Sequence, residues 1–452
     1  MTMRDLTGLG APFATGSTGP RAAVQIEQGE LDDFQRSARL LLAHPLVTIT
    51  WPRVGALAAV RRWEVPLCTE FARLLGYRLD VGRASARLYR RAATTSVHRG
   101  PMTHTGRAMG RLTCSFLCLT LAALEGLGDQ TTASRLSEEV LRLRSGDDTL
   151  PVDLTQYDQR KAFVDAVKWL EDRGVLRLCD GTVEQWLSSD ANGDALYDVD
   201  RDCVSRLLVA SPSVLRDVGE AADFLVDDYS PTDDAQRNRV RHRVGRRLIE
   251  GPLVSYEDLD ADELAYVRHR RTRVARDLET LTGCVVESRA EGLCLIDAAV
   301  EPVSAERFPG GGTLTQAALL CGAALVDRAI AIGAEGSAPR EALPTLMAEV
   351  TPAPEGGRVV TAAEADAQWE DVVARYGTRF KAEYREAPDR LHREVIALLE
   401  RFGLIGVTGR GVVVHAALAR YRPATRVDGS EGDDGGLADA QLSMPAGFDD
   451  QR

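Results

Sequence analysis

The feature that most constrains the fold is a helix that ends at a glycine and passes into a β-hairpin, within residues 158–187. Apolar residues in 163–170 recur with the i, i+3, i+4, i+7 spacing of one helix face. Gly174 follows, where helices commonly end in left-handed backbone. Residues 175–178 and 183–187 then read as two strands joined by a turn. The stretch therefore predicts a helix, a glycine stop and a hairpin.

The same order recurs twice. One helix closes at Gly283 before a hairpin that turns at residues 289–292, and another closes at Gly403 before a turn at residues 408–411. A helix that packs on two earlier helices and then enters a hairpin is the last part of a winged-helix module. Three such endings predict three modules, whose spacing of roughly 110 to 120 residues is too long for a solenoid array.

Length and composition agree with several small domains. A chain of 452 residues is expected to hold two to four domains, and 44% apolar with 27% charged residues is a globular balance. The net charge of -12 excludes a uniformly basic surface, so any contact with nucleic acid must be local.

We therefore predict a mainly α fold with small β-hairpins (α+β), built of tandem winged-helix modules and a helical N-terminal region. The predicted divisions are a disordered lead over 1–28, a helical N-terminal region over 29–111, a first winged-helix module over 112–210, an arginine-rich middle winged-helix-like module over 213–300, a C-terminal winged-helix module over 310–422 and a disordered acidic tail over 423–452.

The cysteines and the hydropathy predict the compartment. Eight cysteines are scattered without a C-x-x-C pair or a zinc spacing, which favours reduced thiols. No run approaches the roughly 18 continuous apolar residues of a membrane span, and no signal pattern opens the chain. We expect a cytoplasmic protein that does not insert into a membrane.

The motifs that carry chemistry are weak. The glycines at 310–312 lack the Lys-Ser/Thr of a P-loop and read as a flexible entry to a helix. The acidic stretch 190–200 has its glycine misplaced for an EF-hand, so turn and helix-cap roles are expected. No serine stands in a nucleophile elbow. We expect a binding or assembly protein, with no catalytic residues, no metal and no cofactor.

Two dense arginine clusters stand out in the middle module. A helical projection turns Arg268, Arg273 and Arg276 outward and places Arg270 and Arg271 beside the core edge. A solvated helix face is the alternative, but the arginine fork suits phosphate oxygens, so we predict salt-sensitive, sequence-independent contact with duplex DNA. The predicted DNA-binding residues are Arg237, Arg239, Arg241, Arg243, Arg246 and Arg247 in the first cluster and Arg268, Arg270, Arg271, Arg273 and Arg276 in the second.

The corresponding helix of the first module has a different outward face. Its charges alternate in sign through Lys161, Asp165, Lys168 and Asp172. Alternating charges suit solvent or a protein partner better than phosphates, so these four residues are the predicted partner-binding surface.

Several stretches also resemble a known family. Gln130-Thr131-Thr132 leading to Leu136, residues 158–176 and, above all, residues 193–201 resemble the KITE subunit of the Wadjet anti-plasmid defence system, a tandem winged-helix element similar to MukE of bacterial condensins. The resemblance extends over about residues 31–420. It implies a non-catalytic subunit that binds a kleisin, reaches an SMC ATPase through that kleisin, forms a homodimer and holds double-stranded DNA without sequence preference. A separate nuclease subunit would cut the plasmid.

Two other functions stay open. A stand-alone winged-helix transcriptional regulator would bind a promoter palindrome by itself, and the missing basic face in the first and third modules argues against it. An enzyme of unrecognised type would need a polar pocket that the sequence does not reveal.

Overall fold

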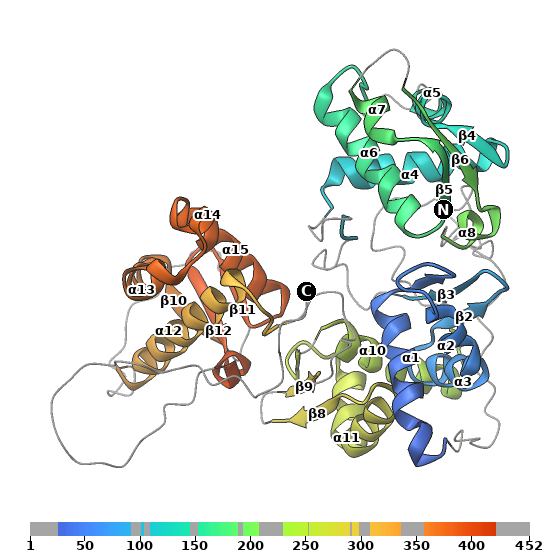
Figure 1. The fold of residues 1–452 in the computed structure, drawn as a ribbon. Coiled ribbons are helices and arrows are strands. Elements are labelled where there is room, and N and C mark those ends of the chain that lie inside the picture. The colour runs from blue at the N-terminus through green and yellow to red at the C-terminus, as the bar shows by residue number, and fades with distance from the viewer. Residues whose placement is uncertain are drawn as a thin grey trace, which may run out of the picture. The chain divides into compact units, whose positions relative to one another are not determined.

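The computed structural model describes residues 26–91, 101–103, 109–144, 152–188, 193–207, 229–251, 253–289, 292–297, 308–335 and 357–421. The chain divides into two compact units, residues 1–306 and 307–452 (Figure 1). The predicted disordered lead, up to residue 25, and the acidic tail lie outside the described residues. The fold is mainly α with small antiparallel three-stranded sheets, as the sequence predicted.

Within the described residues, four modules repeat one arrangement. A helix precedes the first strand, further helical structure follows, and two antiparallel strands complete the sheet with the last strand in the centre. The N-terminal module holds α1 (Leu31–Ala43), β1 (Leu46–Thr48), α2 (Ala56–Arg62), α3 (Glu64–Leu75), β2 (Arg78–Val81) and β3 (Ser85–Tyr89). The first module holds α4 (Arg111–Gly126), β4 (Gln130–Thr132), α5 (Ala133–Arg144), α6 (Tyr157–Asp172), β5 (Leu176–Gly181), α7 (Val183–Leu187), β6 (Ala195–Val199) and α8 (Arg201–Leu207). The middle module holds α10 (Asp233–Glu250), β7 (Leu253–Ser255), α11 (Ala261–Thr282), β8 (Val285–Ser288) and β9 (Gly292–Ile296).

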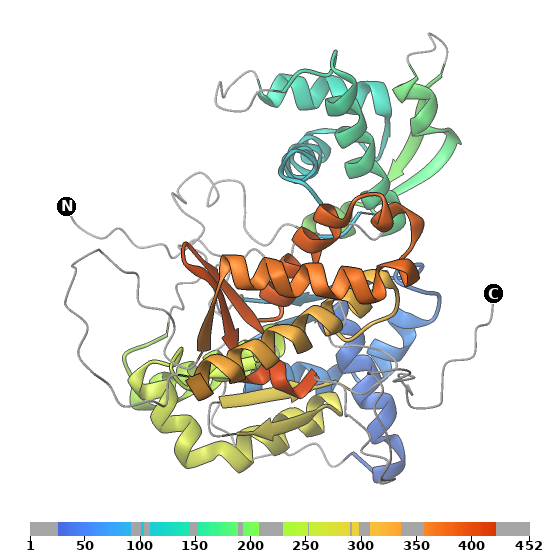
Figure 2. The same ribbon diagram turned by 90° about the vertical axis from the view of Figure 1, so that its left-hand side faces the viewer.

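The C-terminal module forms the second unit. It holds α12 (Thr313–Glu335), β10 (Gly357–Thr361), α13 (Ala362–Tyr376), α14 (Ala382–Arg385), α15 (Pro388–Arg401), β11 (Ile405–Thr408) and β12 (Gly411–His415). Helices α12 and α13 run side by side (Figures 1 and 2). By length and composition alone, Thr313–Gly333 could cross a membrane. This segment is part of α12, which packs against α13 and α15, and its residues Cys321 and Leu325 are buried.

The N-terminal region differs from the predicted helical region because it contains a complete sheet. Pro45 follows the end of α1, and the buried Leu46 and Val47 pair with β3. Trp63 separates the second and third helices of this region, α2 and α3.

The hairpin predicted in the first module is wrong in its second strand. Residues 183–187 form helix α7, because Thr182 and Gln185 make a capping box that starts a helix there. The returning strand is β6, in which Ala195, Tyr197 and Val199 are buried. Helix α8 follows this strand and begins at Arg201.

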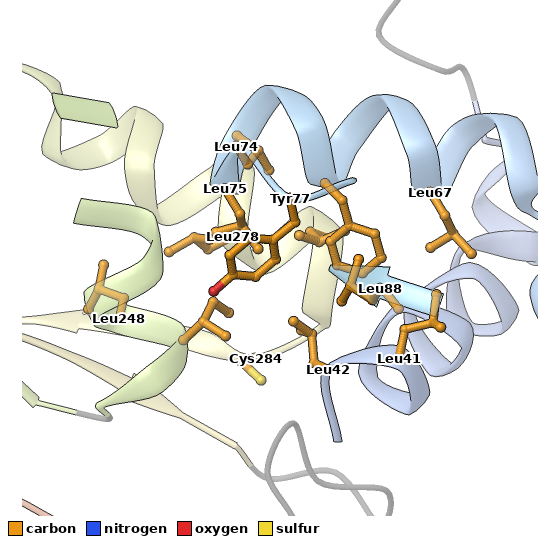
Figure 3. Packing of buried hydrophobic residues seen from close by; sticks show 14 of the residues in the cluster. Leu41, Leu42, Leu67, Leu74, Leu75, Tyr77, Leu88, Leu248, Leu278 and Cys284 are labelled. Carbon is orange, nitrogen blue, oxygen red and sulfur yellow. The ribbon is translucent and has the colours of Figure 1, made fainter. Parts of the chain in front are cut away.

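The N-terminal and middle modules share one hydrophobic core, although most of the first module lies between them in the sequence. Leu41, Leu75 and Leu88 of the N-terminal module pack in the same cluster as Leu248 and Leu278 of the middle module (Figure 3). The first module has a separate core, with Phe116 and Phe163 at its centre. Two segments far apart in the chain therefore form one folded pair, which we call the module pair.

The module pair is an internal duplication. Strands β1, β2 and β3 correspond to β7, β8 and β9 at a constant separation of 207 residues, as from Leu46 to Leu253. Gly76 and Gly283, which end α3 and α11 in left-handed backbone, have the same separation. One continuous helix, α11, takes the place of α2 and α3.

Each half of the module pair caps a helix of the other half. Gln35 on α1 donates to the carbonyl oxygens of Glu279 and Thr280 at the end of α11, both at 3.2 Å. At the equivalent end of α3, Arg246 on α10 donates to the carbonyl oxygen of Leu75 at 2.7 Å. The last carbonyls of a helix have no partner within it, so these side chains satisfy groups that burial would otherwise leave unpaired.

Candidate nucleic-acid interface

The long helix α11 carries more exposed arginines than α10, the other described helix of the middle module. Its start is fixed by a capping box between Asp260 and Glu263, and it ends at Gly283 with φ of 70°. Val267, Val274, Leu278 and Leu281 bury one face in the shared core, which turns the opposite face to solvent.

The exposed face of α11 carries uncompensated positive charge. Arg268, Arg270, Arg271 and Arg276 are exposed. Among the described residues, the side chains of Arg268, Arg270 and Arg276 have neither a hydrogen bond nor an ion pair, and Arg271 donates to the Ser288 hydroxyl at 3.4 Å. Exposed guanidinium groups on one helix are free to meet phosphate oxygens.

The helical projection misplaced three arginines of this helix. Arg270 and Arg271 lie in solvent instead of beside the core. Arg273, expected to point outward, is half-buried and its Nε lies 3.6 Å from the carboxylate of Asp277. Arg273 is drawn inward because α3 packs on this side of α11, where Arg73 of α3 also reaches Asp277 at 3.3 Å.

The first arginine cluster is largely committed to structure. Arg246 is only 2% exposed and holds the end of α3, so it offers no surface to DNA. The carboxylate of the fully buried Glu263 forms ion pairs with two arginines of α10. Its Oε1 atom lies 3.1 Å from Nε of Arg243, and its Oε2 atom lies 3.5 Å from Nη2 of Arg247. A buried carboxylate requires such compensation, and these arginines join α10 to the start of α11.

The remaining members of that cluster differ from one another. Arg237 is exposed and pairs with Asp234 at 2.5 Å. Arg239 is exposed. Arg241 is half-buried and donates to the side-chain oxygen of Asn238 at 2.6 Å. Of the residues predicted to bind DNA, the exposed ones are therefore Arg268, Arg270, Arg271 and Arg276 on α11 and Arg237 and Arg239 on α10.

A protein-family model matches residues 38–424, nearly the whole described chain, and carries the description "Protein of unknown function (DUF2398)". The chain belongs to the DUF2398 family. No curated protein and no solved structure matches it.

The DUF2398 chain presents alternating charges on α6 of the first module. Lys161 and Asp172 are exposed, whereas Asp165 and Lys168 are half-buried. Lys168 pairs with Glu184 of α7. Positive and negative groups thus alternate along this helix, and its charge pattern differs from that of α11.

The acidic stretch before α8 has local roles where the structure describes it. Asp194 accepts the backbone N–H groups of Ser134 and Ala195, and Asp200 caps α8 through Cys203. Hydrogen bonds from Arg177 lower the pKa of Asp198. In the described part of the chain, no group of three or more His, Cys, Asp or Glu residues could hold a metal ion.

Sequence reasoning missed the duplication and the contribution of the N-terminal module. Arg73, Tyr266 and Asp277 were not singled out, because their importance depends on the packing of α3 against α11. A signal was present, since Pro-Leu-Val occurs at 45–47 and again at 252–254.

Proposed function

We propose that this DUF2398 protein is the non-catalytic KITE subunit of a Wadjet-type SMC complex in the cytoplasm. In this role it binds the kleisin, pairs with a second copy and holds duplex DNA without sequence preference during defence against plasmids. Support comes from the KITE-like stretches, from the repeated order of helices and three-stranded sheets, and from the arginine face of α11. The arginine face carries the DNA part of the proposal.

The two halves of the module pair differ on the face that carries the arginines of α11. In the module pair, the positions of Thr272 and Arg276 on α11 are occupied on α3 by Val65, which is 72% exposed, and Thr69. Arg276 therefore has no basic counterpart on α3, whereas Arg268 corresponds to the exposed Arg61 of α2.

The alternating face of α6 supports a protein partner, for which we propose the kleisin. Lys161 and Asp172 are the exposed ends of this face and can meet opposite charges on a partner helix. Because each charge lies near one of opposite sign, duplex DNA would gain little from this surface.

The DNA proposal is tested by reversing Arg268, Arg271 and Arg276 to Glu. Binding of random-sequence duplex to the full-length protein is measured by fluorescence anisotropy over a range of salt concentrations. Three lost phosphate contacts should reduce the slope of log K against log salt by about 2 to 3. A control of equal charge change reverses the exposed Arg111, Arg135 and Arg410 and should leave the slope unchanged.

The complex is tested by co-expression with an SMC ATPase, a kleisin and the nuclease subunit from adjacent genes. The α11 variant should still co-purify with the kleisin but fail to restrict plasmids. Lys161→Glu with Asp172→Lys should weaken co-purification instead. Unchanged DNA affinity of the complex carrying the α11 variant would refute the DNA surface, and tight binding of one palindrome by the isolated protein would favour the regulator.

A further inference from the structure

The duplication supplies an internal reference for one unusual site in the middle module. Between α1 and the junction of α2 with α3, the N-terminal module closes its core with Phe34 and Trp63, whose rings lie 5.9 Å apart edge to face. At the separation of 207 residues, the equivalents of these aromatic residues are Arg241 and Arg270. Two like charges therefore replace an aromatic pair that is almost entirely buried.

The surroundings of the two arginines are also charged. Tyr266, Arg270, Arg273 and Asp277 follow one another at i, i+4, i+7 and i+11 along a stripe of α11. Arg241 of α10 interacts electrostatically with Tyr266, Arg273 and Asp277, and Arg270 also interacts with Tyr266. The site lies where α3, α10 and α11 pack together.

The N-terminal module contributes a further ion pair to this junction. Arg73 of α3 reaches Asp277 with both terminal nitrogens at 3.3 Å and also pairs with Glu70 at 2.5 Å. Together with the ion pair from Arg273 to Asp277, these contacts use both carboxylates of the cluster. Glu70 and Asp277 therefore hold Arg73 and Arg273 in place.

The positive charges of Arg241 and Arg270 are not paired with either carboxylate of this cluster. Among the described residues, neither arginine forms an ion pair, and the only hydrogen-bond partner of the Arg241 side chain is the neutral amide of Asn238. The Nε atom of Arg241 is buried without a partner in the described part of the chain. Burial lowers the pKa of Arg241, and the nearby Arg73 and Arg273 lower it further. An anion would relieve both the repulsion and the missing hydrogen bond.

We propose that Arg241 and Arg270, with the hydroxyl of Tyr266, form a phosphate-binding site at the junction of α3, α10 and α11. The planar guanidinium fork matches phosphate oxygens, and the Tyr266 hydroxyl adds a neutral donor. Building on the function proposed above, the phosphate belongs to the backbone of DNA held along α11. A free phosphorylated compound is the other source of the same chemistry.

The site is tested with Arg241→Gln and Arg270→Gln in the full chain. Gln removes the charge without leaving an unpaired carboxylate, because Asp277 retains Arg73 and Arg273. Arg241→Lys keeps the charge but loses the fork, and Arg135→Gln in the first module is the matched control. Thermal unfolding is measured with inorganic phosphate against chloride at constant ionic strength, and DNA binding by anisotropy against salt.

Phosphate should raise the unfolding temperature of the wild type and of the Arg135→Gln control by the same amount. It should raise the unfolding temperature of Arg241→Lys by less. It should not raise the unfolding temperature of Arg241→Gln or Arg270→Gln. Each Gln variant should bind random duplex about eightfold more weakly at 0.1 M salt, with a slope smaller by about one, because one phosphate contact is lost. Weaker DNA binding by the Gln variants, without any change in unfolding temperature with free phosphate, also supports the site. A single free anion binds more weakly than a phosphate that belongs to a bound DNA chain.

Other results overturn the inference or its DNA assignment. Gln variants that match the wild type in both measurements overturn the site. If the variants lose the rise in unfolding temperature with phosphate and still bind DNA like the wild type, that result assigns the site to a free phosphorylated compound. A wild type that binds no DNA refutes the DNA part of the proposed function, and the phosphate measurement alone then decides this inference.

Discussion

Replacing Gly283 by Ala tests whether the two halves of the module pair cap one another. Gly283 has φ of 70°, and an added Cβ would lie 2.6 Å from Oε1 of Gln35. Left-handed backbone costs an alanine about 1–2 kcal/mol. Moving Gln35 aside would also break its two hydrogen bonds to the end of α11, at about 1 kcal/mol each. The expected loss in the free energy of unfolding is therefore about 3–4 kcal/mol.

Gly55→Ala is the matched control in the same unit. Gly55 has φ of 86°, but nothing lies within 4 Å of an added Cβ, so only the backbone cost of about 1–2 kcal/mol applies. The two variants should therefore differ by about 2 kcal/mol, roughly a thirtyfold difference in the ratio of folded to unfolded protein. Urea unfolding followed by tryptophan fluorescence reports mainly on the first unit, which holds Trp51, Trp63, Trp169 and Trp186.

A double variant separates the contact from the backbone strain. In a Gln35→Ala background the obstructing amide is absent, so Gly283→Ala should cost only the backbone term. The two substitutions should then show a coupling energy of about 2 kcal/mol. Purely additive losses, or equal losses for Gly283→Ala and Gly55→Ala, would refute mutual capping.

Three further changes test other parts of the fold. Arg246→Leu should cost about 2–3 kcal/mol in urea unfolding, because the Leu75 carbonyl loses a buried charged donor. Arg173→Ala should cost about 1–3 kcal/mol and shift the tryptophan emission, because the guanidinium lies 4.3 and 3.7 Å from two indole rings. Hydrogen bonding by Arg328 lowers the pKa of Glu364 to about 2. Since this folded-state pKa is depressed, its stabilisation is present above about pH 4.5 and is lost as the pH falls toward 2. In acid titration of the full chain, Glu364→Gln should flatten this part of the stability profile of the C-terminal unit.

Local signals predicted much of the fold. Gly283 and Gly403 end helices in left-handed backbone, and hairpins follow both, because a residue without Cβ before a turn is a local cause. The return strand in the first module could not be placed this way. Its apolar residues at 183 and 187 suit a strand as well as a helix, and only the capping box with Gln185 decides for the helix.

Tertiary packing decided what the sequence left open in the candidate site. Arg246 and Arg268 look alike in an arginine-rich sequence, but one is buried against the end of α3 and the other is exposed. A projection of α11 alone does not include α3, which pairs with Asp277 and draws Arg273 inward. Which arginines remain available to a ligand thus depends on contacts between modules far apart in sequence.

The two halves of the module pair kept one framework and diverged in their side chains. The glycines that end α3 and α11 and the strands that follow them correspond one to one. Where the framework is capped, the residues change but the role is preserved, as with Gln35 and His242, both of which contact a helix-end carbonyl. Where Phe34 closes one half, Arg241 stands in the other. A buried aromatic residue contributes more to stability than a half-buried arginine without a counter-ion. An arginine at this position therefore fits the proposed binding of an anion better than a role in closing the core.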